Sequence, residues 1–385
     1  MQLIKNKTNI DFIGKRRVAL FLSSVLNLAI VVGIALFQFN WGVDFAGGTL
    51  VELKFPKAVT AEQIRLAVEH GGLPEPVVQG LGASDENMFL VRLGGTTQLT
   101  APNAVKAEAA LKALGDGVEV RKPDLDNGLI NLRSKTKLDV AKIKEAVEAS
   151  GTGVASVKDM GGAEGLFDFQ VKAAGMSEKV QAALKAGMPD TAFEMRRVDY
   201  VGPAVGKQLR NKGITALLYA MIAILIYVAF RFDLKFGPGA LVAMVHDVIM
   251  VAGYYLVTRR EFNLTSIAVL LTILGYSIND TIVIYDRIRE EMARFKGKPL
   301  TEIINIAVNE TLSRTILTSG VTALSLVGLL IFGVGEIFDF AAAMLVGIVV
   351  GTYSSVYIAS PLTIWLDERE AAKQAGGAST VAKHA

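Results

Sequence analysis

The stretch LLTILGYSINDTIVIYDRIREE, residues 270–291, begins as an apolar membrane-type run and ends as a dense charged run. Inside it stands the pair Asn279-Asp280, flanked on both sides by aliphatic residues. A carboxylate in a segment of hydrocarbon length costs about 3 kcal/mol to insert, so it indicates a functional position. Asp280 is therefore the first candidate functional residue, and the rest of the chain can be interpreted around it.

The composition indicates a membrane protein. The 385 residues are 51% hydrophobic, with a mean hydropathy of +0.41, which is too apolar for an ordinary soluble protein. The net charge of +3 does not argue for a nucleic-acid partner. The absence of cysteine excludes disulfides, thiolate metal sites and cysteine nucleophiles. His70, His246 and His384 are too few and too scattered for a zinc site, so we expect neither a metal nor a cofactor.

Six apolar runs are long enough to cross a bilayer core of about 30 Å. The first follows a basic tail, residues 1–17, and a cleaved signal peptide would begin in the same way. That run is too long for a signal peptide, however, and no small-residue cleavage site follows it, so we expect a permanent span. The expected spans are residues 18–39, 213–230, 236–257, 264–285, 315–332 and 340–366.

The basic residues between the spans predict the orientation. They gather in the link 231–235 and the loop 286–314, which the positive-inside rule places in the cytoplasm with the tails 1–17 and 367–385. Arg259-Arg260 counts against this orientation. Residues 40–210 are then extracytoplasmic. Within the loop, 299–311 has its apolar residues on one side, which predicts a helix along the cytoplasmic membrane surface.

The polar interval 40–210 contains an internal repeat. AVTAEQIRLAVE (58–69) resembles KLDVAKIKEAVE (137–148), and each has the apolar spacing of a helix. Each half has the order β-α-β-β-α-β of a ferredoxin-like unit. We therefore predict an α+β domain of two tandem ferredoxin-like units, 40–124 and 125–210, with a coincidence of common helix patterns as the alternative.

Polar residues within the spans supply the candidate site. Arg314, at the start of the fifth span, is the natural partner of an ionised Asp280, and Asn279 adjoins it. A carboxylate that alternates between a protonated and an arginine-paired state can couple proton passage to a helix rearrangement. One charge moved through 100 mV is worth about 2.3 kcal/mol, enough to shift a two-state equilibrium more than tenfold. A fixed Asp280–Arg314 ion pair, or a hydrogen bond made for packing, explains the same residues equally well.

Other positions are secondary candidates. Asp247 beside His246 is more simply a structural hydrogen bond, while Asp286 and Arg287 are more simply interfacial charges. Small residues at helical spacing predict close helix packing at Gly239, Ala243, Gly275, Gly347 and Gly351. No catalytic residue is expected, because the chain lacks the Gly-x-Gly-Asp signature of intramembrane aspartyl proteases. It has no P-loop either, so ATP is not the expected energy source.

Several long motifs occur in an order that resembles the SecF family of protein-export subunits. They are WGVDFAGGTLVELKF (41–55), VDYVGPAVGKQLR (198–210), HDVIMVAGYY (246–255), GYSINDTIVIYDRIREE (275–291), NETLSRTILTSGVTALS (309–325) and GIVVGTYSSVYIASPL (347–362). The resemblance implies a six-span half of the resistance-nodulation-division type in the bacterial cytoplasmic, or inner, membrane. It implies work with SecD, the SecYEG channel and YajC on preproteins, driven by the proton motive force. The family's transmembrane Asp and its Arg match Asp280 and Arg314.

One feature departs from that family, whose external domain is typically a single short ferredoxin-like unit. The corresponding interval here, 40–210, has room for two. Two other functions compete with proton-coupled export. One is a small-molecule or lipid exporter of the same superfamily, which would usually need twelve spans. The other is a structural scaffold for SecD without proton coupling.

Overall fold

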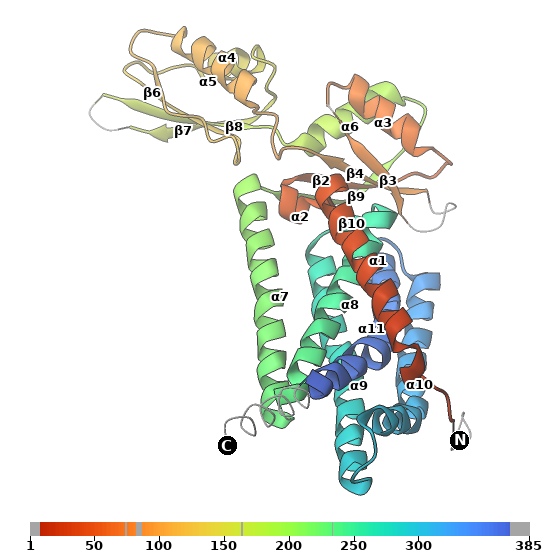
Figure 1. The fold of residues 1–385 in the computed structure, drawn as a ribbon. Coiled ribbons are helices and arrows are strands. Elements are labelled where there is room, and N and C mark those ends of the chain that lie inside the picture. The colour runs from red at the N-terminus through yellow and green to blue at the C-terminus, as the bar shows by residue number, and fades with distance from the viewer. Residues whose placement is uncertain (1–7, 74, 82–86, 163–164, 233, 370–385) are drawn as a thin grey trace, which may run out of the picture. The chain divides into compact units, whose positions relative to one another are not determined.

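The computed structural model describes residues 8–73, 75–81, 87–162, 165–232 and 234–369 (Figure 1). The chain divides into a helical unit, Met1–Asn40 with Lys212–Ala385, and an α+β unit, Trp41–Asn211. Parts of the tails expected at 1–17 and 367–385 lie outside the described residues. The sequence predicted this division, because apolar runs of membrane length are confined to the helical unit.

The described part of the helical unit contains six helices long and apolar enough to cross a membrane. Each expected span coincides for most of its length with one of them. They are α1 (Arg16–Phe37), α7 (Pro203–Arg231, whose first residues belong to the α+β unit), α8 (Gly237–Thr258), α9 (Leu264–Arg294), α10 (Leu300–Phe332) and α11 (Glu336–Ser354). The short helices η1 (Ile13–Lys15) and η2 (Leu234–Phe236) precede α1 and α8.

The last span is not a uniform α-helix. After α11 the chain forms a π-helix, η3 (Ser355–Ala359), and then continues as a helix to Arg369. A π-helical turn inserts an extra residue and is frequently found at functional sites. Here it follows directly on Ser354, which belongs to the polar cluster described below.

The helix predicted from residue 299 is present, since α10 begins at Leu300, but it runs on without a break into the expected span 315–332, and α9 continues to Arg294. The apolar side of 299–311 is also not on a lipid surface. Its residues Ile304, Ala307 and Val308 are buried in the main core of the helical unit. Periodicity predicted the apolar face correctly, but it does not distinguish a face that covers protein from one that covers lipid.

The segment before α1 lies on this first part of α10. The Asn305 Oδ1 accepts the Phe12 N–H at 3.0 Å, and the Asn309 Oδ1 accepts the Ile10 N–H at 2.9 Å. The Asn309 Nδ2 also donates to the Ile10 carbonyl at 2.9 Å. Two side-chain amides of α10 therefore satisfy backbone groups of the segment before α1.

The first sheet of the α+β unit has the strand order β3–β4–β2–β9. Val51 of β2 lies opposite Val91 of β4 and Val198 of β9, so alternate residues of the central strands reach the same core. The elements are β2 (Gly48–Lys54), β3 (Val77–Leu81), β4 (Met88–Leu93), β9 (Glu194–Val201), α3 (Ala61–His70) and α6 (Met176–Gly187). Both helices bury apolar residues in one core with this sheet, among them Ile64 and Val180.

The second sheet has the order β5–β6–β8–β7 and its own core with two further helices. Its elements are β5 (Glu119–Val120), β6 (Leu129–Ser134), β7 (Val154–Gly161), β8 (Phe167–Ala173), α4 (Ala101–Lys112) and α5 (Val140–Glu148). The remaining short elements are α2 (Val43–Ala46), β1 (Asn40–Trp41) and β10 (Glu261–Phe262).

The tandem order 40–124 followed by 125–210 is wrong. The strand β9 pairs with β2, so α6 and β9 complete the first sheet, whereas α4 and β5 join the second. The second sheet is thus inserted between β4 and α6. The last helix and strand of the two expected units have changed places, and each sheet still has the pattern β-α-β-β plus α-β.

Packing explains the exchange where periodicity could not. Both expected units end in a helix followed by a strand, so the pattern alone does not say which sheet that pair joins. A Cβ at Gly187, the last residue of α6, would lie 2.8 Å from the Ala67 Cβ, so α6 fits closely against α3. This close fit is one contact that α6 makes with a helix of the first sheet.

Candidate functional site

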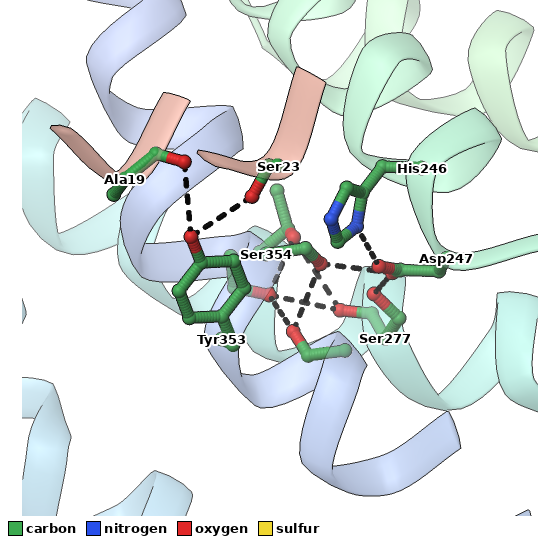
Figure 2. A network of polar contacts seen from close by, with 10 residues as sticks. Ala19, Ser23, His246, Asp247, Ser277, Tyr353 and Ser354 are labelled. Carbon is green, nitrogen blue, oxygen red and sulfur yellow. Dashed lines mark hydrogen bonds and ion pairs between the residues drawn. The ribbon is translucent and has the colours of Figure 1, made fainter. Parts of the chain in front are cut away.

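The helical unit contains two carboxylates in very different surroundings. The first, Asp247 of α8, is fully buried and accepts three hydrogen bonds (Figure 2). Its Oδ1 lies 2.9 Å from the His246 Nδ1, and its Oδ2 accepts the hydroxyls of Ser277 at 2.5 Å and Ser354 at 2.8 Å. Ser277 belongs to α9 and Ser354 to α11, so one carboxylate joins three helices.

Further hydroxyls extend this cluster along the contact between α9 and α11. The hydroxyls of Thr281 and Ser355 lie 2.9 Å apart, and Ser355 also donates to the Gly351 carbonyl at 2.9 Å. The phenol of Tyr353 lies 2.9 Å from the Ser23 hydroxyl of α1 and donates to the Ala19 carbonyl at 3.2 Å (Figure 2). These bonds satisfy buried polar groups, which would otherwise be costly in an apolar interior.

The second carboxylate, Asp280 of α9, has fewer partners, with Ser319 of α10 as its hydrogen-bonding neighbour among the described residues. Its side chain is only 3% exposed, and its Oδ2 is buried without a hydrogen-bond partner among the described residues. Thr315 of α10, the helix that packs against α9, likewise has a buried hydroxyl without a described partner. A buried carboxylate oxygen with an unused lone pair can take up a proton without breaking an existing bond.

Arg314 lies close enough to Asp280 to act on it electrostatically, and Ser319 is a second neighbour of the carboxylate from α10. No ion pair within 4.0 Å joins Asp280 and Arg314 among the described residues, and Arg314 is exposed. The fixed ion pair considered from the sequence is therefore absent from this structure. The arrangement is a buried carboxylate with an arginine nearby that does not bind it.

The structure separates Asn279 from Asp280. Although the two are adjacent in the chain, Asn279 is exposed while Asp280 is buried, as a rotation of about 100° per helical residue requires. Gly275, four residues earlier, is exposed as well, and a Cβ there would meet nothing within 4 Å. Gly275 therefore has no close-packing role within this chain.

The other predicted packing glycines do approach neighbouring helices. A Cβ at Gly351 would lie 2.9 Å from the Ser277 Cβ, and one at Gly239 would lie 2.7 Å from the Ala359 carbonyl oxygen. A Cβ at Gly347 would overlap the Ile273 side chain, and Ala243 is buried in the main core. The close approach at Gly351 brings Ser277 and Ser354 to the same carboxylate.

The charged residues near the end of α9 form more ion pairs than isolated interfacial charges would form. Asp286 pairs with Arg231 of α7 at 3.1 Å. Arg287 binds Glu310 of α10, with its Nε 2.6 Å from the Glu310 Oε2. Arg287 also contacts Glu290 and Glu291 on its own helix.

Sequence reasoning missed several members of these groups. Ser277, Thr281 and Tyr353 were not singled out, and neither was Glu310. A signal was present for two of them, because Ser277 and Thr281 are hydroxyl residues four positions apart in an apolar run and therefore share one face of α9. The tyrosine and glutamate partners come from distant parts of the chain.

The described residues contain no group of three or more His, Asp or Glu side chains that could hold a metal ion. The chemistry that the geometry supports is proton transfer at a carboxylate. Both oxygens of Asp247 are engaged by neighbouring donors, so it is suited to fix the helices. Asp280 has capacity to spare and a cation near it, so it is suited to change its charge.

Comparisons with protein-family models match two parts of the chain. Residues 179–369 match "Protein export membrane protein SecD/SecF, C-terminal", and residues 32–59 match the "SecD/SecF GG Motif". The chain is 38% identical over 367 residues to the protein translocase subunit SecF of Magnetococcus marinus, covering 95% of each chain. It is 36% identical over 388 residues to that of Koribacter versatilis, covering 96% of this chain and 94% of the relative.

Solved structures give a consistent result. The crystal structure of SecDF, a translocon-associated membrane protein from Thermus thermophilus, is similar with a TM-score of 0.65 and 30% identity, over 95% of this chain and 40% of that one. SecDF in its super-membrane-facing form matches with a TM-score of 0.59 and 29% identity, over 98% of this chain and 41% of that one. The chain thus spans about two-fifths of the SecDF chains that it matches.

The six candidate spans and these matches define a multi-pass membrane protein of the protein-export type. The chain belongs to the SecF family of protein translocase subunits. The resemblance drawn from the sequence motifs is thereby confirmed.

Proposed function

We propose that this chain couples the proton motive force to preprotein export as a SecF subunit, working with SecD beside the SecYEG channel and YajC. The observation that carries the proposal is Asp280, a buried carboxylate on a candidate span with an unpartnered oxygen and a nearby, unpaired arginine. A family subunit that only held SecD in place would not need this arrangement. Membrane-buried carboxylates of this kind occur in the proton relays of pumps and transporters.

The physical mechanism follows from two charge states. A protonated Asp280 is neutral and suits the buried position between α9 and α10. After proton release the charged carboxylate is costly to bury alone and attracts Arg314, which draws the two helices into a different arrangement. One proton crossing 100 mV supplies about 2.3 kcal/mol, which shifts a two-state equilibrium roughly fiftyfold.

An exposed face of α9 supports SecD as the partner. Ala268, Thr272, Gly275 and Asn279 recur at helical spacing on that face, and all four are exposed in this chain. An amide that faces lipid is costly, whereas small residues let a second helix approach closely and hydrogen-bond to it. A SecD helix against this face would cover Asn279 and lie one residue from Asp280.

We further propose the bacterial inner membrane with cytoplasmic termini and an extracytoplasmic α+β unit, Trp41–Asn211. The basic link and the basic residues between α9 and α10 favour this orientation by the positive-inside rule. The α+β unit, with its two ferredoxin-like sheets, is then the part that a preprotein meets as it emerges. Movement of the spans would be transmitted to it through α1 and α7, which flank it in sequence.

The test is Asp280→Asn in a strain whose only SecF is this chain, expressed with its own SecD. Pulse–chase labelling measures the rate of preprotein processing with and without a protonophore. We expect the variant to export preprotein at least tenfold more slowly than wild type. Its rate should equal that of wild type treated with protonophore, and adding protonophore to the variant should not lower the rate further. Asp286→Asn, at the charged end of the same helix, is the matched control and should keep most of the gradient-dependent rate.

Two outcomes would favour the competing functions. Wild-type export by Asp280→Asn, or by Asp280→Asn combined with Arg314→Gln, would make the chain a scaffold for SecD. A defect in substrate efflux with normal preprotein processing, after deletion of the gene, would indicate a small-molecule or lipid exporter. Immunoblots of washed membranes establish that each variant is inserted at the wild-type level.

A further inference from the structure

A cluster of charges lies at the end of α9, two helical turns after Asp280. We name it the Arg287 cluster: Arg287, Glu290 and Glu291 of α9 with Glu310 of α10. The guanidinium contacts Glu290 at 2.5 Å and Glu291 at 2.8 Å on its own helix, and its Nε and NH2 both reach the Glu310 Oε2, at 2.6 and 2.5 Å. Two acids of α9 thus anchor an arginine whose remaining donors are directed at α10.

The position of Glu310 gives this contact a consequence. Glu310 precedes Arg314 by four residues on the continuous helix α10, so the two side chains share one face. A glutamate four residues before a basic residue is the favourable orientation for an ion pair along a helix. The structure nevertheless pairs Glu310 with Arg287, and Arg314 forms no ion pair within 4.0 Å among the described residues.

We propose that Arg287 is a positioning residue that holds Glu310 away from Arg314 and thereby keeps Arg314 available to Asp280. The inference rests on the proposed proton-coupling role of Asp280. Without Arg287, the Glu310 carboxylate turns to Arg314, which is its neighbour one turn along α10. Arg314 then stabilises a permanent negative charge instead of the transient one on Asp280, and proton release becomes harder.

The cluster is arranged so that Arg287 is not easily displaced. Glu291 is only 2% exposed and one of its oxygens has no described partner, so it depends on Arg287 and, at 3.7 Å, Arg294 for compensation of its charge. The charged groups that face this region are Asp286, Glu290, Glu291 and Arg294 of α9, Glu310 and Arg314 of α10, and Arg231 of α7.

The experiment compares Arg287→Gln, Glu310→Gln and the double variant in the export strain described above. Arg287→Gln should lower gradient-dependent export about fivefold, the factor for loss of one partly exposed ion pair. It should also move the pH at half-maximal rate upward by about 0.7 unit, because the same factor applies to the proton concentration. Glu310→Gln alone should stay within twofold of wild type. The double variant should return to the rate and pH profile of Glu310→Gln, because no carboxylate remains to capture Arg314.

The rescue separates positioning from a structural role. If the cluster only holds α9 against α10, Glu310→Gln will be as impaired as Arg287→Gln and the double variant will be no better, which overturns the inference. Arg289→Gln removes a neighbouring exposed arginine as a control for net charge. The failure of this inference is distinct from failure of the proposed function: if Asp280→Asn abolishes gradient dependence while the double variant is not rescued, only the role of Arg287 is wrong.

Discussion

Asp247 and Asp280 are both buried carboxylates on candidate spans, yet their surroundings are opposite. Asp247 accepts hydrogen bonds from His246, Ser277 and Ser354, which join three helices at one point. Asp280 has an oxygen with no described partner, and the nearby Arg314 does not pair with it. The cost of burying a carboxylate is offset by three hydrogen bonds at the first position and only partly offset, by Ser319 and the nearby Arg314, at the second.

This difference distinguishes a carboxylate that stabilises the fold from one that can change its protonation state. A group that must change its charge cannot have every lone pair committed to a fixed donor, because each protonation would then break a bond. A group that holds helices together needs those bonds. The comparison therefore predicts that substitutions at Asp247 act mainly on stability and substitutions at Asp280 mainly on coupling.

The largest effect on stability is expected from Asp247→Ala. The substitution leaves the His246 ring and two buried hydroxyls without their acceptor, and removing one member of such a buried polar group costs about 3 kcal/mol. Asp280→Ala removes a carboxylate that has one oxygen without a described partner and Ser319 as its hydrogen-bonding neighbour, so we expect a loss of only about 1 kcal/mol. The free energy of unfolding, from loss of helical circular dichroism during titration of mixed micelles with SDS, measures both. Equal losses for the two variants would contradict the comparison.

A smaller effect is expected from Ser277→Ala, which removes one of the three donors to Asp247. The loss of a single hydrogen bond to a carboxylate costs about 1.5 kcal/mol. Ser277→Thr keeps the hydroxyl but adds a methyl group where the Cβ already faces Gly351 closely, so it tests packing in place of hydrogen bonding. If Ser277→Ala is neutral in the same titration, the bond to Asp247 contributes nothing to stability and the cluster is less cohesive than its geometry indicates.

The α+β unit shows how far sequence reasoning extends to the fold. Helix positions followed from periodicity, so α3 and α5 were expected within a few residues of their observed bounds. The assignment of α6 and β9 to the first sheet did not follow. Which of two similar sheets receives a helix–strand pair depends on contacts such as that of Gly187 with Ala67, which connect residues far apart in the chain.

The two carboxylates of the candidate site could be found from the sequence, but their different roles could not. A single Asp in an apolar run is visible in sequence because its insertion cost is large, so Asp280 and Asp247 could both be found. Their different roles depend on partners from other helices, such as Ser354 for Asp247 and Ser319 near Asp280. Local pattern also grouped Asn279 with Asp280, although the helix turns them to different sides.

A third carboxylate lies outside the spans, and its substitution is expected to have the smallest effect on stability of the three. Asp168 of β8 forms a two-pronged ion pair with Arg133 of β6, at 2.8 and 2.9 Å. The hydrogen bonds from Arg133 hold the pKa of Asp168 below its usual value. Both side chains are about one-third exposed, so water and salt compete for the pair and its contribution to stability is small.

The sign of the pH effect follows from that direction. Because the pKa of Asp168 is lower in the folded chain than in the unfolded chain, the pair stabilises the sheet above the unfolded pKa of about 4 and loses this effect as the pH falls through the folded value. Hydrogen exchange of the β6 and β8 amides, corrected for intrinsic rates, should show more opening at pH 3 than at pH 5. Arg133→Gln should reduce that difference, and high salt should reduce it in the wild type. If the difference in opening between pH 3 and pH 5 is unchanged in Arg133→Gln, other carboxylates control the acid response of this sheet. An ion pair without the burial that Asp247 has would then not be enough to make a carboxylate structural.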